Sequence, residues 1–219
     1  MLSQLLSERF SCRSFDSRPV DEAVIRAAIE LANRAPSGGN TQPWHLHLLV
    51  GNALSEFVTA VAQRGVFQED ALPFPLYPPA SASKPYMERR IKVASSYYEL
   101  ANVSDKAGRL ALSLRNFSFF GAPAAIFLCV DQIAAVNGWA HAGLFAMALQ
   151  LQLQSQGLST CFQEAWANIP ATVRELLSIP DDQVVWCAIA VGFADSSPVN
   201  RIRTERRAFE DFVSVVPKL

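Results

Sequence analysis

The sequence lacks the long apolar runs and the charge bias that define several large protein classes. No stretch approaches the roughly 20 apolar residues of a membrane-spanning helix, and 19 basic residues are balanced by 20 acidic ones. Neither an anionic membrane nor nucleic acid is therefore expected as a partner, since both attract basic proteins. The start of the chain also lacks the basic segment, the apolar segment and the cleavage site of a secretory signal, so we expect a cytoplasmic protein.

Nucleotide-binding, hydrolase and metal motifs are also missing. The sequence has no G-x-x-x-x-G-K-[ST] loop, no G-x-G-x-x-G segment after a strand, no G-x-S-x-G elbow, no H-E-x-x-H pair and no spaced cysteine quartet. The four cysteines stand far apart, and we interpret them as reduced and free of metal. The three histidines, His45, His47 and His141, are interpreted as structural. No side chain is an obvious catalyst, which points to a bound cofactor that carries the chemistry.

The hydrophobic pattern favours a single α+β domain. Half of the 219 residues are hydrophobic, which is enough for a sizeable core, and no repeat or linker divides residues 1–219. A loop rich in proline and aromatic residues is expected at about 66–86, because its prolines are incompatible with a regular helix or a central strand. Periodicity predicts helices over 19–35, 58–65, 87–103, 139–157 and 173–179, and strands over 45–51, 124–131 and 184–195.

The predicted helix over 139–157 is unusually apolar. It reads WAHAGLFAMALQLQLQSQG, and Gly157 is expected to end it as a C-terminal cap. A helix that is apolar over more than one face must be buried, either in the core or against a partner subunit. The sequence leaves these two alternatives open.

Residues 36–44 read PSGGNTQPW and are the most loop-like segment near the N-terminus. Proline, serine, glycine and asparagine are the usual turn formers, so composition alone predicts a loop. Gly38 and Gly39 can adopt backbone angles that other residues avoid. The alternative to a plain surface turn is a loop whose backbone is bent to approach a bound ligand.

Arginine is concentrated near both ends of the chain. Arg9 and Arg13 flank Ser11 in ERFSCRSF, and four more arginines lie within residues 201–207. The guanidinium fork matches phosphate geometry, and serine adds a compact donor. Taken alone, each patch is more often a solvated face than an anion site. Without a glycine-rich cradle, a nucleotide-like ligand would have to be bound by arginine and loop amides.

Four ordered segments resemble the FMN-dependent nitroreductases: ERFSCRSF, APSGGNTQPWH, GLSTCFQEAW and VGFADSSPVNRIRTERRAFEDF. RNFSFFGAP, TCFQEAWA and VRELLSIPDD are similar to the branch that includes nitrobenzoate reductases. The resemblance implies a nitroreductase-like α+β sandwich with a mostly antiparallel central sheet flanked by helices. It also implies a homodimer that exchanges its C-terminal segments, with FVSVV as a strand on the partner's sheet, and that holds two FMN molecules at the interface.

The resemblance further implies which residues hold FMN. Arg9, Ser11 and Arg13 would contact the phosphate and the pyrimidine edge of the ring. Phe10 stands where the family commonly has a second arginine, so no side-chain contact is expected from that position. The phosphate site would be completed by Arg206 and Arg203.

The remaining implied contacts come from three other segments. The loop at 36–44 would reach the flavin of the other subunit, and a main-chain amide after the long helix would lie near flavin N5. The residues concerned are Pro36, Ser37 and Asn40 in the loop, Asn116 in RNFSFF, and Gln163, Glu164 and Ala165 in TCFQEAWA.

The implied activity is hydride transfer from NAD(P)H through FMN to nitroaromatic or quinone-like acceptors, with no catalytic side chain and no metal. Enone reduction, dehalogenation or flavin cleavage on the same scaffold remain alternatives, as does a flavin-binding or storage protein without turnover. Flat acceptors need aromatic walls, although a core role is the more common one for any individual aromatic residue. The available residues are Phe67, Phe74, Tyr77, Phe117, Phe119 and Phe120.

Overall fold

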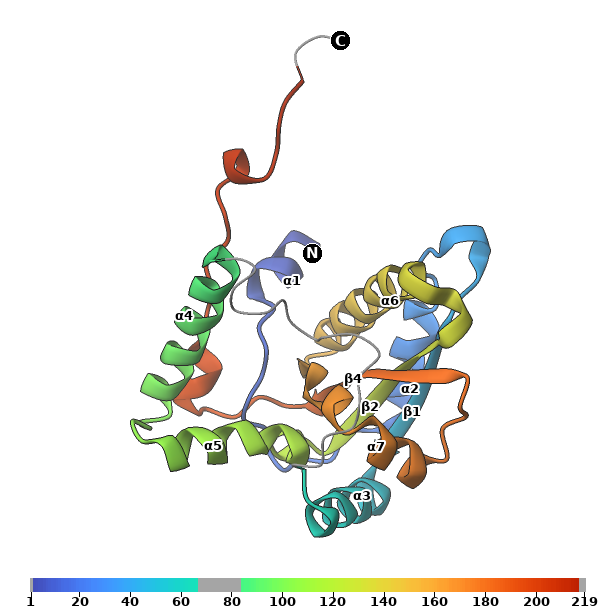
Figure 1. Ribbon diagram of the computed structural model, residues 1–219, viewed down its shortest axis with the longest axis horizontal. Helices are drawn as coiled ribbons and strands as arrows, with labels where there is room; N and C mark the ends of the chain where they lie inside the picture. Colours follow the sequence, from blue (N-terminus) through green and yellow to red (C-terminus); the bar gives the residue numbers. More distant parts are fainter. Residues whose placement is uncertain (1, 67–83, 217–219) are drawn as a thin grey trace.

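The computed structural model describes residues 2–66 and 84–216 (Figure 1). Its helices pack around one antiparallel sheet, so the expected α+β class with a mostly antiparallel central sheet is confirmed. The described elements are α1 (Leu2–Glu8), α2 (Glu22–Ala32), β1 (Trp44–Val50), α3 (Gly51–Arg64), α4 (Lys84–Leu100), α5 (Lys106–Leu114), β2 (Ala124–Asp131), α6 (Ala135–Ser155), β3 (Ser159–Gln163), α7 (Pro170–Leu177) and β4 (Gln183–Gly192).

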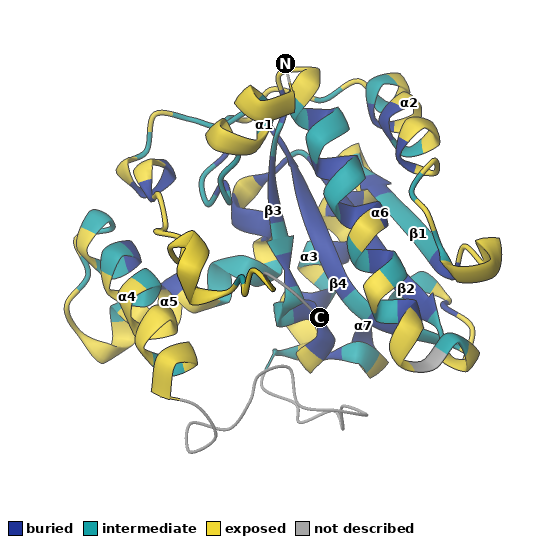
Figure 2. Cartoon of the chain, turned by 90° about the horizontal axis from the view of Figure 1, so that it is seen from above, coloured by how far each residue is buried: buried dark blue, intermediate teal, exposed yellow. Residues whose placement is uncertain are grey.

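The sheet has the strand order β1-β2-β4-β3, so β2 and β4 are central. From Ala124 to Val130, strand β2 is an unbroken apolar run because both of its faces are covered. Phe127 and Cys129 face the core layer under α3 and α7, whereas Ile126 and Leu128 face the layer under α2 and α6. Figure 2 shows β4 mostly dark blue and the helices α1, α4 and α5 largely exposed.

Helix α6 is buried along one face only. Leu149 and Leu153 are fully buried against the sheet, while Val136 is 81% and Leu144 is 49% exposed. Gly157, with φ +78°, lies just beyond the helix end, as its sequence position predicts. The core therefore explains why α6 is apolar on the face that packs against the sheet. It leaves other apolar side chains of the helix, such as Val136 and Leu144, exposed in the single chain.

An aromatic cluster forms the centre of the core layer under α3. Trp166 is fully buried and stacks on Phe119, with ring centroids 4.5 Å apart. Phe57, Phe117 and Phe127 surround the indole at 5.1 to 5.6 Å. Since aromatic side chains bury large apolar areas, this cluster contributes heavily to stability.

Two consecutive phenylalanines in this region have left-handed backbone angles. Phe119 has φ +51° and Phe120 has φ +56°, and both are buried. Such angles cost about 1–3 kcal/mol each for bulky residues and persist only where surrounding packing fixes them. The aromatic cluster supplies that packing. Asn116 lies shortly before this turn and contacts Gln163 at the end of β3.

Several sequence expectations need correction or completion. Periodicity missed α5 and β3, and α3 begins at Gly51 rather than at residue 58. The expected loop at 66–86 lies mostly outside the described residues, and residues 84–86 form the first turn of α4, where a proline is tolerated. Residues 212–216 form no strand in the single chain, and Figure 1 shows them extending away from the body.

Gly192 ends β4 at a point of close approach. A Cβ atom there would lie 2.6 Å from Pro123 Cδ and 2.9 Å from Phe15 Cδ1. We expect Gly192→Ala to lower the free energy of unfolding by about 1–3 kcal/mol through overpacking, measured by urea titration. Adding Pro123→Ala should recover part of this loss. An unchanged midpoint for Gly192→Ala would contradict the close approach.

Candidate functional site

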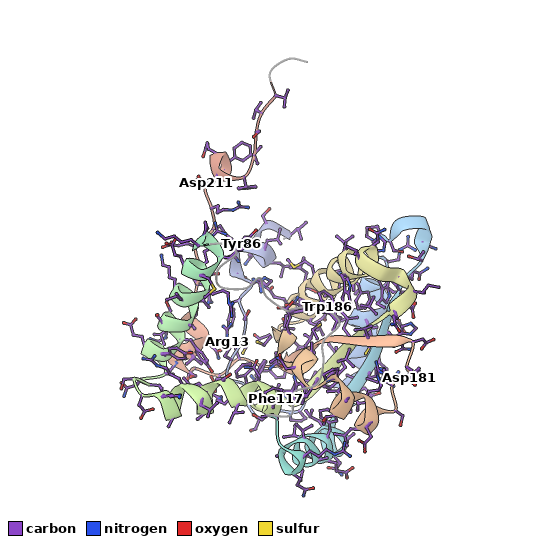
Figure 3. The ribbon with its side chains drawn as sticks, viewed as in Figure 1. Arg13, Tyr86, Phe117, Asp181, Trp186 and Asp211 are labelled. Atoms are coloured by element: carbon purple, nitrogen blue, oxygen red, sulfur yellow. The ribbon has the colours of Figure 1, made fainter. Side chains whose placement is uncertain are left out.

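The N-terminal arm is fixed between β3 and the C-terminal segment. The Cys12 amide donates to Thr160 O at 2.9 Å, and the Arg13 amide donates to Asn200 Oδ1 at 2.9 Å. Asn200 Nδ2 in turn donates to Ser14 O at 2.7 Å. These contacts hold the backbone of Arg13 in place, and Figure 3 shows its side chain in the region between α4 and the sheet.

A cavity of about 350 Å³ lies where the arm, α4, α5 and the end of β3 meet. Its walls combine residues from distant parts of the chain, and the 3₁₀ helix Glu164–Asn168 directly after β3 forms one of them. Five of the residues predicted from the sequence line this cavity together: Arg13, Asn116, Gln163, Glu164 and Ala165.

Gln163 and Asn116 form a polar pair in the cavity wall. Gln163 Nε2 donates to Asn116 O at 2.9 Å and to Asn116 Oδ1 at 3.2 Å. Gln163 is only 2% exposed, and its Oε1 atom has no hydrogen-bond partner among the described residues. A buried unpaired acceptor costs about 1–3 kcal/mol, so this wall is suited to a ligand that supplies a donor.

Arg9 and Arg206, beside the arm, are close enough to interact electrostatically. Burial lowers the pKa of Arg9, and the positive charge of Arg206 lowers it further. Neither arginine forms an ion pair within residues 2–66 and 84–216. A bound anion would relieve both the burial of charge at Arg9 and the repulsion from Arg206.

Arg203 packs against Phe10, which stands where the nitroreductases that the sequence resembles commonly have a second arginine. Its guanidinium carbon lies 4.3 Å from the centroid of the Phe10 ring, a cation–π distance. Arg203 Nη1 also donates to Asn200 O at 2.8 Å and to Ile202 O at 2.9 Å. Phe10, which carries no charge, thus supports a C-terminal arginine through its ring.

The predicted phosphate residues do not share the cavity of Arg13 in the single chain. Arg203 and Arg206 line a neighbouring groove of about 570 Å³ beside α4, and Arg9 lines a smaller cavity of about 200 Å³. Ser11 is half-buried, and its carbonyl oxygen accepts a hydrogen bond from Arg13 Nη1 at 3.3 Å. The arginines therefore form a band along the arm rather than one closed cradle.

The loop residues Pro36, Ser37 and Asn40 are not brought to this cavity. In Figure 1 the segment near residue 40 lies beside α6, at the opposite side of the molecule from α4 and α5. Ser37 Oγ accepts from the Gln42 amide at 2.9 Å, and Asn40 has φ +57°. This loop therefore does not line the cavity of its own chain.

Sequence reasoning missed Tyr97, because nothing in the SSYYEL segment distinguishes it from a helix-packing residue. Tyr97 lines the cavity from α4, and its ring centroid lies 5.5 Å from Arg13 Cζ. Burial raises the pKa of its hydroxyl, so the side chain remains a neutral phenol. Its hydroxyl group has no hydrogen-bond partner in the described part of the chain.

The aromatic residues expected as acceptor walls have mixed positions. Phe119 is a core residue, Phe117 packs on Trp166 at 5.1 Å, and Phe120 is buried but also lines the cavity. The other three expected aromatics lie outside the described residues: Phe67, Phe74 and Tyr77.

The four cysteines, Cys12, Cys129, Cys161 and Cys187, are free and buried, and no group of three or more metal ligands occurs in the described chain. Burial raises the pKa of Cys12 and Cys129 to about 12 and that of Cys161 to about 11. The nucleophilic thiolate is therefore scarce at pH 8.

We expect iodoacetamide at pH 8 to alkylate the folded protein roughly a thousandfold more slowly than the urea-unfolded chain, which should react at four sites. Because folding raises these pKa values, burial of the protonated thiols makes its full contribution to stability below about pH 8.5. That contribution is lost as the pH rises toward 11–12. Rapid native alkylation followed by mass spectrometry would contradict the buried positions.

Comparison with known proteins places this geometry in a family. The model of the nitroreductase family matches residues 6–193. The chain belongs to the nitroreductase family. This nitroreductase-family chain is 33% identical to a 4-nitrobenzoate reductase of Pseudomonas putida over 95% of its own length and 92% of the relative's. No described helix is long and apolar enough to cross a membrane.

Solved structures of the family share the whole fold. An FMN and NADPH-dependent nitroreductase NfnB from Sphigopyxis sp. strain HMH is 35% identical, with a TM-score of 0.94 and full coverage of both chains. The FMN-dependent nitroreductase NfnB from Mycobacterium smegmatis, solved in complex with NADPH, is 26% identical with a TM-score of 0.91, over 98% of this chain and 97% of that one. The described residues therefore share the fold of these nitroreductases.

Proposed function

We propose that this protein is an NAD(P)H-dependent FMN nitroreductase that reduces nitroaromatic or quinone-like acceptors. One observation carries the proposal: the cavity at the end of β3 joins Arg13 to the Asn116–Gln163 pair, whose buried Oε1 atom lacks a donor. The relatives support the chemistry, since they include a 4-nitrobenzoate reductase and two FMN-dependent nitroreductases, of which one is called NADPH-dependent and the other was solved with NADPH.

The residues of the site fit FMN. The ring's pyrimidine edge offers both donors and acceptors, which suits Gln163 Oε1 and the Arg13 guanidinium respectively. A phosphate suits the mutually repelling Arg9 and Arg206, with Arg203 nearby. Ser11, Glu164 and Ala165 complete the proposed contacts within one chain.

Bound FMN supplies the hydride-accepting and hydride-donating chemistry. The chain's own residues would orient the flavin ring and enclose it. Arg13, fixed by Asn200 and stacked near Tyr97, offers a positive charge at one edge of the cavity. Tyr97 and Phe120 form an apolar wall against which a flat molecule can pack. No dedicated acid or base is needed, since positioning at about 3–3.5 Å accounts for much of the rate.

We further propose a homodimer with the C-terminal segments exchanged. Apolar side chains that the single chain leaves open support it, since Val136, Phe212 and Val216 are 81%, 58% and 67% exposed. A partner subunit would also bring the loop with Pro36, Ser37 and Asn40 to the opposite cavity. We propose that residues 1–219 form one domain and that the protein is cytoplasmic, where its free thiols would stay reduced.

The test is spectroscopic. The purified protein should be yellow, should lose its flavin absorbance anaerobically on addition of NADPH or NADH, and should regain it when 4-nitrobenzoate is added. Protein that cannot be reconstituted with FMN would overturn the proposal. Yellow protein that no nicotinamide bleaches would favour flavin storage. Protein that is bleached but reoxidised only by enones or halogenated aromatics would favour the alternative reductions.

A further inference from the structure

The loop at 36–44 is attached to helix α6 through one histidine. The Gly38 amide donates a hydrogen bond to His141 Nε2 at 3.0 Å, across 103 residues of sequence. A backbone N–H can only donate, so Nε2 must present its lone pair, and the ring is then a neutral imidazole with its proton on Nδ1. The contact thus requires an acceptor at this position of α6.

The loop is shaped to make this contact. A Cβ atom on Gly38 would lie 3.2 Å from His141 Cε1 and 3.3 Å from His141 Nε2, so a side chain there would push the ring away. Gly39 and Asn40 follow with φ +60° and +57°, and the Gln42 amide closes the loop onto Ser37 Oγ. The first glycine therefore provides the close approach, and the second provides the left-handed turn.

The position of His141 distinguishes this contact from ordinary core packing. His141 is half-buried on a largely apolar helix, and the neighbouring residue Ala142 is fully buried in the core layer under α6. The His141 side chain lies between the core of its chain and the 36–44 loop, which does not line the cavity of that chain. Because α6 is a long element packed against the sheet, it can hold the loop rigidly.

We propose that His141 is a positioning residue that holds Pro36, Ser37 and Asn40 in place for the cofactor bound by the partner subunit. The inference rests on the proposed function, in which the loop contacts FMN across a dimer interface. A loop held in its binding conformation loses less entropy when the ligand binds. His141 therefore raises FMN affinity in the partner's site without touching FMN.

The first experiment compares His141→Phe with His141→Gln. Phenylalanine keeps a ring but offers no acceptor, whereas glutamine retains one. In His141→Phe we expect faster hydrogen exchange of the Gly38 amide and an FMN dissociation constant about 2- to 10-fold higher, as for one lost hydrogen bond. His141→Gln should recover part of both. Equal FMN affinity in wild-type and His141→Phe protein would overturn the inference.

The second experiment asks whether His141 acts across the interface. Mixed dimers are prepared from one chain with His141→Phe and one with Arg13→Ala, each carrying a different purification tag. If the loop serves the partner, one site combines an intact Arg13 with an intact loop, and half of the FMN should bind with wild-type affinity. If His141 serves its own chain, neither site is intact, and two weakened sites would overturn the inference.

These outcomes separate the inference from the function on which it rests. Wild-type protein that fails to bind FMN would overturn the proposed function and the inference with it. Wild-type protein that binds FMN, together with mixed dimers that hold two weakened sites, would overturn the inference alone. Gly38→Ala provides an independent variant, since its Cβ would displace the ring, and it should raise the FMN dissociation constant in the same direction as His141→Phe.

Discussion

Replacement of Trp166 by alanine is expected to lower the free energy of unfolding by about 3–5 kcal/mol. Trp166 is fully buried, with Phe119 stacked on it at 4.5 Å and Phe117 and Phe127 near its other sides. Alanine would leave a cavity among rings that cannot collapse into it, because β2 fixes Phe127. The left-handed backbone at Phe119 would also lose the packing that holds it.

Trp166→Phe is the matched control for this prediction. Trp166 Nε1 has no hydrogen-bond partner in the described chain, so replacement by phenylalanine removes volume but breaks no such bond. We expect a loss well below that of the alanine variant in urea titrations followed by circular dichroism. The titrations should be repeated at several protein concentrations, since a dimer's apparent stability depends on concentration. Equal losses for the two variants would show that the cluster does not depend on ring packing.

Removal of the Arg13 side chain is expected to weaken FMN binding about 10- to 100-fold, which corresponds to about 1.5–3 kcal/mol for a charge-assisted contact. The backbone amide of Arg13 is held by Asn200, so Arg13→Ala should leave the arm in place and remove only the guanidinium group. Fluorescence titration of the apoprotein with FMN measures the effect directly. Unchanged affinity would remove Arg13 from the proposed site.

Two further variants control for charge alone. Arg13→Lys keeps the charge but lacks the planar fork, so an intermediate affinity is expected. Arg18 lies five residues further along the chain and is paired with Asp16 at 3.0 Å, with its side chain 60% exposed. Arg18→Ala should therefore leave FMN affinity unchanged. A loss as large as that of Arg13→Ala would indicate a general electrostatic effect rather than a specific contact.

Local sequence patterns predicted the regular elements whose burial is uniform. The run AAIFLCVD gave the bounds of β2, because a central strand covered on both faces is apolar throughout. Asp21 marked the start of α2, and its side chain accepts a hydrogen bond from the Ala23 amide at 2.9 Å. The edge strand β3 was missed because STCFQ is short and mixes polar with apolar residues. The N-terminal arm also packs beside it, and a local pattern does not reveal that contact.

The sequence by itself determined the fold class, the order of the family motifs and the residue types of the site. Only the tertiary structure decided which of them meet: Gln163 with Asn116, 47 residues apart, and Gly38 with His141, 103 residues apart. It also placed the 36–44 loop beside α6, away from the cavity of its own chain. The physical reason is that periodicity encodes which face of an element is buried, whereas a shared site depends on how distant elements pack against one another.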